Sequence, residues 1–278
     1  MINELEVIWK DETPNKYVLS TPITEIDDNS LVFSDKEFKI IINIMNFLRG
    51  FYDPNDSYDF ELTIKFDNDF TYYTIVENNE YCVEEIFYKT NLIFKIDKDE
   101  KIPDLSPDWF SISNTTPDFI IRFNRTSIVF EYRNNIFDKV RYAICSFKFL
   151  PNFSITKKDR KKVIEQSTNL LLDEEIRYKF REIIPKLFSD IFEVTDDLKI
   201  ITNKDPNGDL IKLEDRGSGI NRIFDLLPLM LGSLKYDHVL LIPNLNLHLH
   251  FLVSTNLRKL YQSESIKESK GRILTYKD

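Results

Sequence analysis

Glycine, cysteine and net positive charge are all scarce in this sequence of 278 residues. It has 6 glycines and 2 cysteines, and 37 Lys and Arg stand against 46 Asp and Glu, which gives a net charge of −9. An acidic protein repels phosphate backbones at long range, so nucleic-acid binding would need a local basic patch. Cys82 and Cys145 form no CxxC pair and only 3 histidines are present, so we expect no metal site.

Long apolar runs are missing as well. The longest, residues 223–234, is shorter than the roughly 20 residues that span a bilayer. The first ten residues lack the basic and apolar segments of a signal peptide. We therefore expect a cytoplasmic protein with reduced thiols and no membrane contact.

Large aromatic side chains supply the material for a core. The apolar share is only 42%, but 22 Phe and 13 Tyr each bury much area. At roughly 100–200 residues per domain, the length fits one large domain or two closely joined ones. No linker is evident, so we predict a single domain over 1–278, with an N-terminal lobe at 1–150, a helical subregion at 151–195 and a C-terminal lobe at 196–278.

Strict alternation of apolar and polar residues predicts an antiparallel meander in the N-terminal lobe. Its strands are expected at 60–66, 70–76, 81–88 and 91–96, with turn residues between them. Before the meander, apolar residues at helical spacing predict a helix over 38–49, which Gly50 ends.

The second half of the chain has a different pattern. A charged stretch from Thr156, and apolar residues three and four apart after Asp173, predict helices. Strand, helix, strand then predicts a parallel sheet, so the fold class is α/β with a mixed sheet. The elements that carry this prediction are a buried helix at 219–232, a buried strand at 239–242, a helix at 250–261 and a strand at 272–275.

Three motifs near the C-terminal end occur in a familiar order. Residues 216–222 read RGSGINR and precede a helix sequence IFDLLPLML, residues 239–251 read VLLIPNLNLHLHF, and residues 272–278 read RILTYKD. The chain thereby resembles the ABC-type ATPases of the SMC-like and OLD-like group, often labelled AAA-family ATPases, many of which accompany bacterial restriction and anti-phage systems. The motifs resemble that family's signature loop, Walker B strand and sensor strand.

The resemblance extends more loosely to the N-terminal lobe. Residues 46–49, NFLR, match the end of the helix that follows Walker A in this family. Residues 33–40 fall where the Walker A loop is expected, with Lys39 at its lysine position. The resemblance implies an ABC-ATPase-like head with a mixed sheet, an inserted antiparallel meander and a helical subregion.

The residues that hydrolyse ATP in that family are replaced here. Walker A needs several glycines around the phosphate and a hydroxyl for magnesium, but the first 49 residues hold no glycine and Ile40 replaces the hydroxyl. Pro243 and Asn244 stand for the two Walker B acids, and neither can act as a base. Lys277 replaces the sensor histidine. We expect no catalytic residue, and for Lys39 a solvated position on a helix.

The loop before the buried helix keeps more of the family's chemistry. In the resembled family this loop faces a nucleotide held by a second head. Gly217, Ser218 and Gly219 can offer N–H groups to an anion, and Arg222 follows them. Two interpretations stay open: a loop that completes the nucleotide site of a partner, or a turn that only starts a core helix.

Three further groups have both a functional and a structural interpretation. His250 matches a family histidine, and we expect it to have a structural or capping role rather than to hold a metal with His248. Trp109 and Phe110 fit a partner contact or a core anchor. The basic cluster fits a DNA-facing patch or a solvated helix face, and consists of Lys157, Lys158, Arg160, Lys161 and Lys162.

A nuclease motif is a rival interpretation. Asp118 follows Pro117, and an apolar segment at 128–133, expected as a strand, holds Glu131 and Arg133. Two acids and a lysine in this order hold magnesium and orient a water molecule. Arg133 stands for the lysine, however, and arginine cannot deprotonate.

The sequence thus predicts a catalytically degenerate ATPase-like subunit that acts through a protein partner. The expected partner is an active ATPase or effector subunit in a homo- or hetero-oligomer, and the resemblance suggests a place in bacterial anti-phage defence. No cofactor is expected. The alternatives are an atypical ATP-binding protein or ATPase, which would use ATP and Mg²⁺, and a metal-dependent nuclease that uses Asp118 and Glu131.

Overall fold

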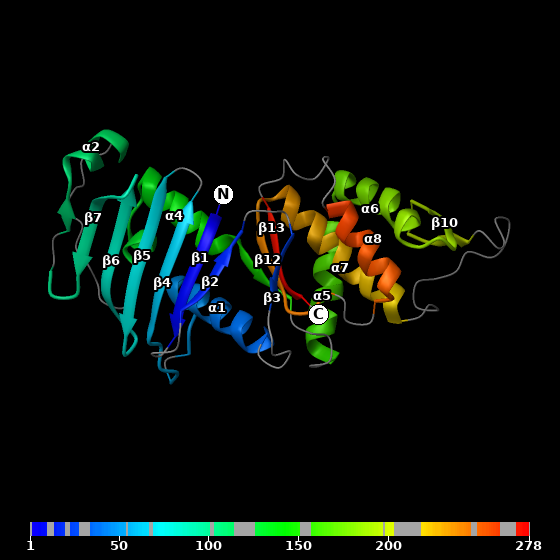
Figure 1. Ribbon diagram of the computed structural model, residues 1–278, viewed down its shortest axis with the longest axis horizontal. Coiled ribbons are helices and arrows are strands. Elements are labelled where there is room, and N and C mark those ends of the chain that lie inside the picture. The colour runs from blue at the N-terminus through cyan, green and yellow to red at the C-terminus, as the bar shows by residue number, and fades with distance from the viewer. Residues whose placement is uncertain are drawn as a thin grey trace. The chain divides into compact units, whose positions relative to one another are not determined.

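The chain forms two compact units (Figure 1). One consists of Met1–Ser20 and Lys36–Lys148, and the other of Thr21–Asp35 and Phe149–Asp278. The predicted single domain with its three parts stays a prediction. The structure is a computed structural model that describes residues 2–9, 14–19, 23–27, 34–53, 55–66, 69–100, 103–113, 126–150, 157–196, 198–202, 218–245, 249–261 and 271–277.

An antiparallel sheet is the centre of the first unit. Its strand order is β2-β1-β4-β5-β6-β7-β8, and neighbouring strands are antiparallel throughout. The predicted meander is confirmed as β4 to β7, while β1, β2 and β8 extend the sheet without having been predicted. The strands are β1 (Ile2–Trp9), β2 (Asn15–Val18), β4 (Phe60–Phe66), β5 (Phe70–Glu77), β6 (Glu80–Tyr88), β7 (Asn91–Asp97) and β8 (Asp104–Leu105).

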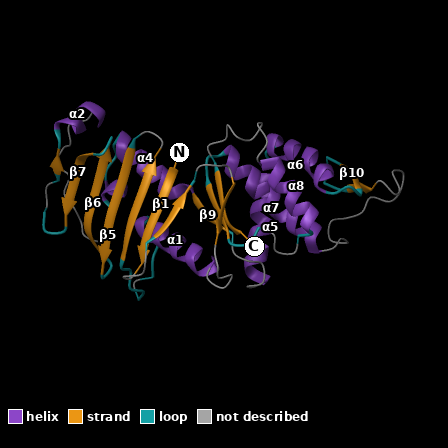
Figure 2. Ribbon diagram, viewed as in Figure 1, coloured by secondary structure: helices purple, strands orange, loops and turns teal. Residues whose placement is uncertain are grey.

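Helices cover the apolar face that the alternation creates. In the view of Figure 2, α1 (Ser34–Leu48) and α4 (Asn135–Ser146) lie behind the strands. Phe47 of α1 contacts Phe60 edge to face at 5.8 Å between ring centroids, and Tyr81 at 5.5 Å. Aromatic side chains therefore help to join the sheet to α1.

The end of α1 agrees with the predicted glycine cap. Gly50 has a φ of +80° and its N–H donates to the carbonyl of Phe47 at 2.9 Å. A β-carbon at Gly50 would meet no atom within 4 Å, so the left-handed backbone, rather than lack of space, favours glycine here.

Trp109 is a core anchor and Phe110 is not. Both belong to α2 (Pro107–Ser113). Trp109 is fully buried, with its ring 5.3 Å from that of Phe94 and 5.4 Å from that of Phe137. Phe110 is 48% exposed. A contact with a partner therefore stays open for Phe110 alone.

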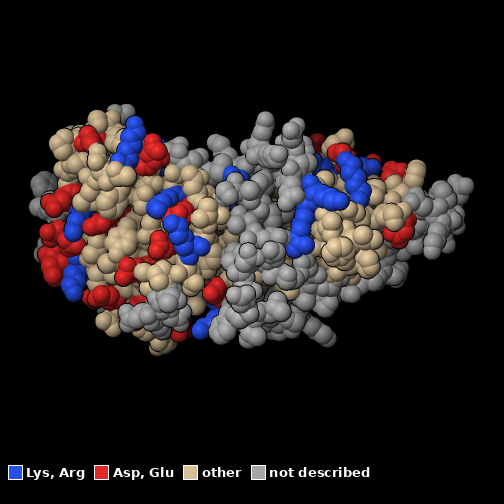
Figure 3. All heavy atoms as spheres, in the orientation of Figure 1, with Lys and Arg blue, Asp and Glu red and all other residues tan. Residues whose placement is uncertain are grey.

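The opposite face of the sheet carries charges of both signs (Figure 3). Glu4 pairs with Lys16 at 2.9 Å and with Lys65 at 2.6 Å. A further ion pair joins Lys95 Nζ to Glu85 Oε1 at 3.5 Å. Since these charges alternate across the strands, the described residues of this face form no continuous basic surface for a nucleic acid.

The second unit contains the predicted parallel sheet. Its strand order is β3-β13-β12-β9, and β13 is parallel to both β3 and β12. The buried strand and final strand expected from the sequence are thus confirmed as neighbours. The strands are β3 (Ile23–Asp27), β12 (Val239–Ile242), β13 (Arg272–Lys277) and β9 (Phe147–Phe149), of which only Phe149 is counted in this unit.

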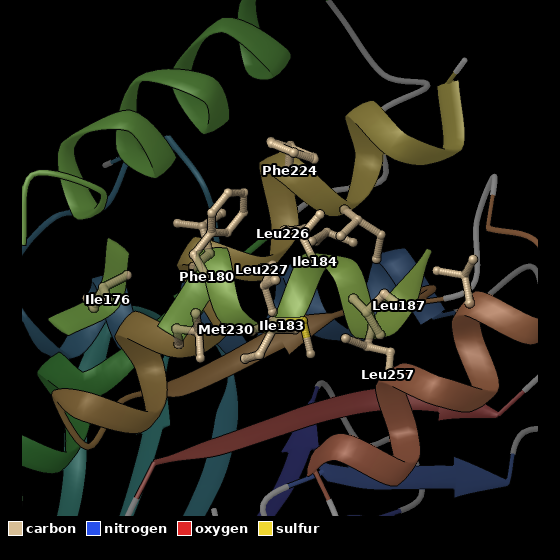
Figure 4. Packing of buried hydrophobic residues seen from close by; sticks show 14 of the residues in the cluster. Ile176, Phe180, Ile183, Ile184, Leu187, Phe224, Leu226, Leu227, Met230 and Leu257 are labelled. Carbon is tan, nitrogen blue, oxygen red and sulfur yellow. The ribbon is translucent and has the colours of Figure 1, made fainter. Parts of the chain in front are cut away.

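Helices pack around this sheet through a shared apolar cluster. Figure 4 shows Phe180 and Ile184 of α6 facing Leu227 and Met230 of α7. The three-and-four spacing after Asp173 predicted the buried face of α6 correctly. The remaining elements of this unit are α5 (Lys157–Leu170), α6 (Glu174–Leu187), α7 (Ser218–Lys235) and α8 (Phe251–Tyr261), with a two-stranded ribbon of β10 (Ile191–Val194) and β11 (Ile200–Thr202).

Asp173 caps α6, as predicted, and also ties it to the end of α7. Its Oδ1 accepts from the backbone N–H groups of Glu175 and Ile176 at 3.0 and 3.1 Å. Lys235 Nζ donates to both carboxylate oxygens at 2.8 Å, and the Tyr236 hydroxyl to Oδ2 at 2.7 Å. The hydrogen bonds from Lys235 and Tyr236 lower the pKa of Asp173.

This network gives a pH-dependent prediction. Because its pKa is lowered by folding, Asp173 stabilises the fold above the ordinary aspartate pKa of 3.8, and this stabilisation is lost as the pH falls below it. Asp173→Asn keeps a capping side chain but not the charge. We expect it to lower the melting temperature at pH 7, by a difference that shrinks as the pH falls below 3.8. Thermal melts against a Glu174→Gln control test this, and a pH-independent difference would contradict it.

Candidate functional site

The carboxyl end of the parallel sheet collects the positions that the sequence singled out. Ligands of parallel α/β sheets bind where the strands end. Ile242 pairs with Thr275, and Lys277 pairs with Asp27 of β3. Pro243 and Asn244, which follow β12, therefore come to the same edge as Lys277. Three positions that the sequence singled out are thus brought to one edge of the sheet.

The two residues that follow β12 carry no carboxylate. Pro243 is buried and has no side-chain oxygen. The Oδ1 of Asn244 is buried and accepts no hydrogen bond within the described part of the chain. Magnesium and a catalytic base both call for carboxylates here. The two residues that follow β12 supply none.

Arg222 reaches this edge from the second turn of α7. Its side chain is 3% exposed, and Nη2 donates to the backbone carbonyl of Asn244 at 3.4 Å. Burial lowers the pKa of Arg222 to about 9, and the charge of Asp225 one turn along the helix opposes this shift. The residue that the sequence associated with nucleotide binding therefore lies inside the second unit.

The positions of the other nucleotide-binding candidates neither support nor oppose a nucleotide site. Ser218 and Gly219 form the start of α7, whereas Gly217 lies outside the described residues. Lys39 is exposed on α1 in the first unit, as expected for a solvated helix lysine. Of positions 33–40, where the resemblance places the Walker A loop, residues 34–40 are helical and residue 33 lies outside the described residues. Whether any of these residues binds nucleotide stays a prediction.

His250 has the capping role that the sequence predicted. Its Nδ1 accepts from the backbone N–H of Leu252 at 3.3 Å, and its carbonyl accepts from Val253 and Ser254 at the start of α8. His248 lies outside the described residues. The contacts of His250 with described residues are those of a helix cap and do not point to a ligand.

The basic cluster lies at the start of α5. Lys161 and Lys162 are exposed there, while the side chains of Lys157, Lys158 and Arg160 lie outside the described part of the structure. Exposure fits both a solvated helix face and a DNA-facing patch. The nucleic-acid interpretation of this cluster therefore stays a prediction.

The prediction of a strand at 128–133 is wrong. A short helix, α3 (Ile128–Glu131), forms there. The cause lies on β6, far away in sequence. Glu84 is fully buried, and its carboxylate accepts from the Ser127 hydroxyl at 2.6 Å and from the Ile128 N–H at 3.0 Å. A carboxylate that holds the first N–H of a segment favours a helical turn.

The described residues do not show Asp118 and Glu131, the two acids of the nuclease interpretation, close to each other. Glu131 ends α3, and Asp118 lies outside the described residues. Within the described ranges no group of three or more His, Cys, Asp or Glu is placed to hold a metal ion.

The buried carboxylate of Glu84 is a polar centre that sequence reasoning missed. Besides Ser127 and Ile128, the Tyr72 hydroxyl donates to it at 2.8 Å. Burial and the charge of Glu84 raise the pKa of Tyr72 well above its ordinary value. The sequence contained a signal for this burial. Residues two apart in a strand lie on the same face, and Ile86, two residues after Glu84 in β6, is on the buried face.

None of the helices that the structure describes is both long enough and apolar enough to span a bilayer.

Comparison with known proteins finds no matching family model and no matching curated protein. Solved structures that are similar include two SMC heads. The SMC head domain from Thermotoga maritima is 12% identical with a TM-score of 0.47, over 99% of this chain and 89% of that one. An SmcHead bound to the C-winged helix domain of ScpA is 14% identical with a TM-score of 0.47, over 100% and 90%.

Proposed function

We propose that this chain is a catalytically degenerate ATPase-like subunit that acts through a protein partner and does not hydrolyse ATP. The observation that carries the proposal is the end of β12. A buried proline and an asparagine follow this central parallel strand, where phosphoryl transfer requires carboxylates to hold the metal ion and to orient water. Neither residue can act as a base, and the pair offers a metal ion no carboxylate.

The glycine content supports the same conclusion independently. A phosphate-cradling loop depends on glycines that let successive N–H groups turn inward. None of the first 49 residues is glycine, so neither the segment after β3 nor the start of α1 can form such a loop in its usual form.

A protein partner is proposed because one element of the resembled family is retained. Ser218 and Gly219 start α7, a helix of 18 residues whose first N–H groups lack partners within the helix. An active ATPase or effector subunit would place its nucleotide against this start. The association with bacterial anti-phage defence rests on the family resemblance alone.

Phosphate release from Mg²⁺-ATP by the purified chain tests the proposal. We expect a rate equal to the buffer blank for the unmodified protein and for Lys39→Ala. Lys36→Ala is the matched control, because Lys36 is also exposed on α1. Hydrolysis that is lost in Lys39→Ala and retained in Lys36→Ala would overturn the proposal and favour the atypical ATPase.

A further inference from the structure

The positive charge of Arg222 lies where the parallel sheet ends. Its guanidinium is buried and donates to the carbonyl of Asn244, the second residue after β12. α7 ends shortly before β12 begins, and the two elements contact each other. The chain thus folds back so that the first turns of α7 meet the far end of β12.

This charge persists under ordinary conditions. Burial lowers the pKa of Arg222 only to about 9, so the guanidinium stays protonated at neutral pH. Asp225, on the next turn of α7, favours the charged form. A protonated guanidinium has only N–H donors, so it cannot act as a ligand to a metal ion.

A cation held at the strand end is incompatible with a metal ion there. A divalent ion within a few ångströms of a guanidinium is repelled, most strongly where water is excluded. Magnesium and manganese also need oxygen ligands, preferably carboxylates. Pro243 provides none, and Asn244 offers only neutral amide oxygens, of which the backbone carbonyl accepts from Arg222.

We infer that Arg222 is a built-in cation that takes the place of a divalent metal ion at the carboxyl end of β12 and keeps this edge closed to metal-bound nucleotide. The inference rests on the proposed function, since it states how the degenerate site is kept inactive. Pro243 and Asn244 leave the end of β12 without carboxylate ligands for a metal ion. The guanidinium of Arg222 supplies the positive charge there in place of the ion.

Restoring the acids with and without Arg222 tests this inference. The double variant Pro243→Asp/Asn244→Glu supplies two carboxylates at the strand end, and adding Arg222→Met removes the charge while keeping a long side chain. Binding of Mn²⁺ alone is measured by calorimetry. We expect the triple variant to bind Mn²⁺ at least about tenfold more tightly than the double variant, because the guanidinium no longer repels the ion. Equal affinities, or no binding by either, would overturn the inference.

A charge-retaining variant separates repulsion from packing. Arg222→Lys in the same double-acid background keeps a cation, so we expect Mn²⁺ binding to stay as weak as with arginine. Tight binding by the lysine variant would overturn the inference. If the methionine variant does not melt cooperatively, Arg222→Gln replaces it in the same comparison. ATP hydrolysis by the unmodified chain would refute the proposed function, whereas equal Mn²⁺ affinities would refute only the role of Arg222.

Discussion

Replacing Phe180 with alanine is expected to lower the free energy of unfolding by about 3–5 kcal/mol, the usual cost of deleting a buried aromatic ring. Phe180 is fully buried in the cluster of Figure 4, and its ring contacts that of Phe224 edge to face at 4.9 Å between centroids. Deletion leaves a cavity between α6 and α7 and removes this aromatic pair. Chemical denaturation measures the loss.

Tyr178→Ala is the matched control, because it removes an aromatic ring from the same helix at a position that is 68% exposed. We expect this change to alter the free energy of unfolding by no more than about 0.5 kcal/mol. Equal losses in the two variants would mean that the buried face of α6 is assigned wrongly.

Gly271→Ala is the second change with a large expected effect. A β-carbon at Gly271 would lie 2.1 Å from the carbonyl oxygen of Ser233 and 2.6 Å from the α-carbon of Leu234. These are backbone atoms at the end of α7, so α7 and β13 must move apart to admit a methyl group. We expect a loss of about 3 kcal/mol or more in the free energy of unfolding.

Gly232→Ala provides the comparison for this effect. There the added β-carbon meets only the end of the Leu170 side chain, at 2.9 Å, which can rotate away. Alanine is also favoured over glycine within a helix by up to about 1 kcal/mol. We expect little net change, measured by the same denaturation. A loss at Gly232 as large as that at Gly271 would contradict the close approach of α7 and β13.

Local patterns predicted the elements whose residues decide their own conformation. The meander followed from strict alternation in β4 to β7, and α6 from its apolar spacing together with a capping aspartate. The parallel pairing of β12 and β13 followed from a buried strand, a helix and a second strand. In each case the residues that predict the element lie within it or next to it.

Other features depended on residues distant in sequence. The segment after Ser127 contains the residues of a strand, yet it forms a helical turn because Glu84, 44 residues before Ile128, binds its first N–H. The edge strand β2 is short and gains its place only by pairing with β1. No local pattern encodes such pairings, because they are stabilised by the assembled sheet.

The candidate site shows the same division. The prediction about its chemistry rests on the missing glycines and on Pro243 and Asn244, which are visible in the sequence. Its geometry could not be predicted, because the contact from Arg222 to Asn244 joins residues 22 positions apart through the folding of α7 back along β12. The burial of Arg222 against its own chain was not predicted, and whether it lies near a nucleotide stays a prediction.

Equilibrium binding of Mg²⁺-ATP by the purified chain tests the central claim most directly. A ligand at 100 times its dissociation constant stabilises a protein by about 2.7 kcal/mol, which a thermal-shift titration detects. The absence of Walker A glycines and of acids after β12 predicts no saturable shift with Mg²⁺-ATP. A saturable shift that disappears in Lys39→Ala but not in Lys36→Ala would contradict the account and identify a nucleotide site that the chain retains.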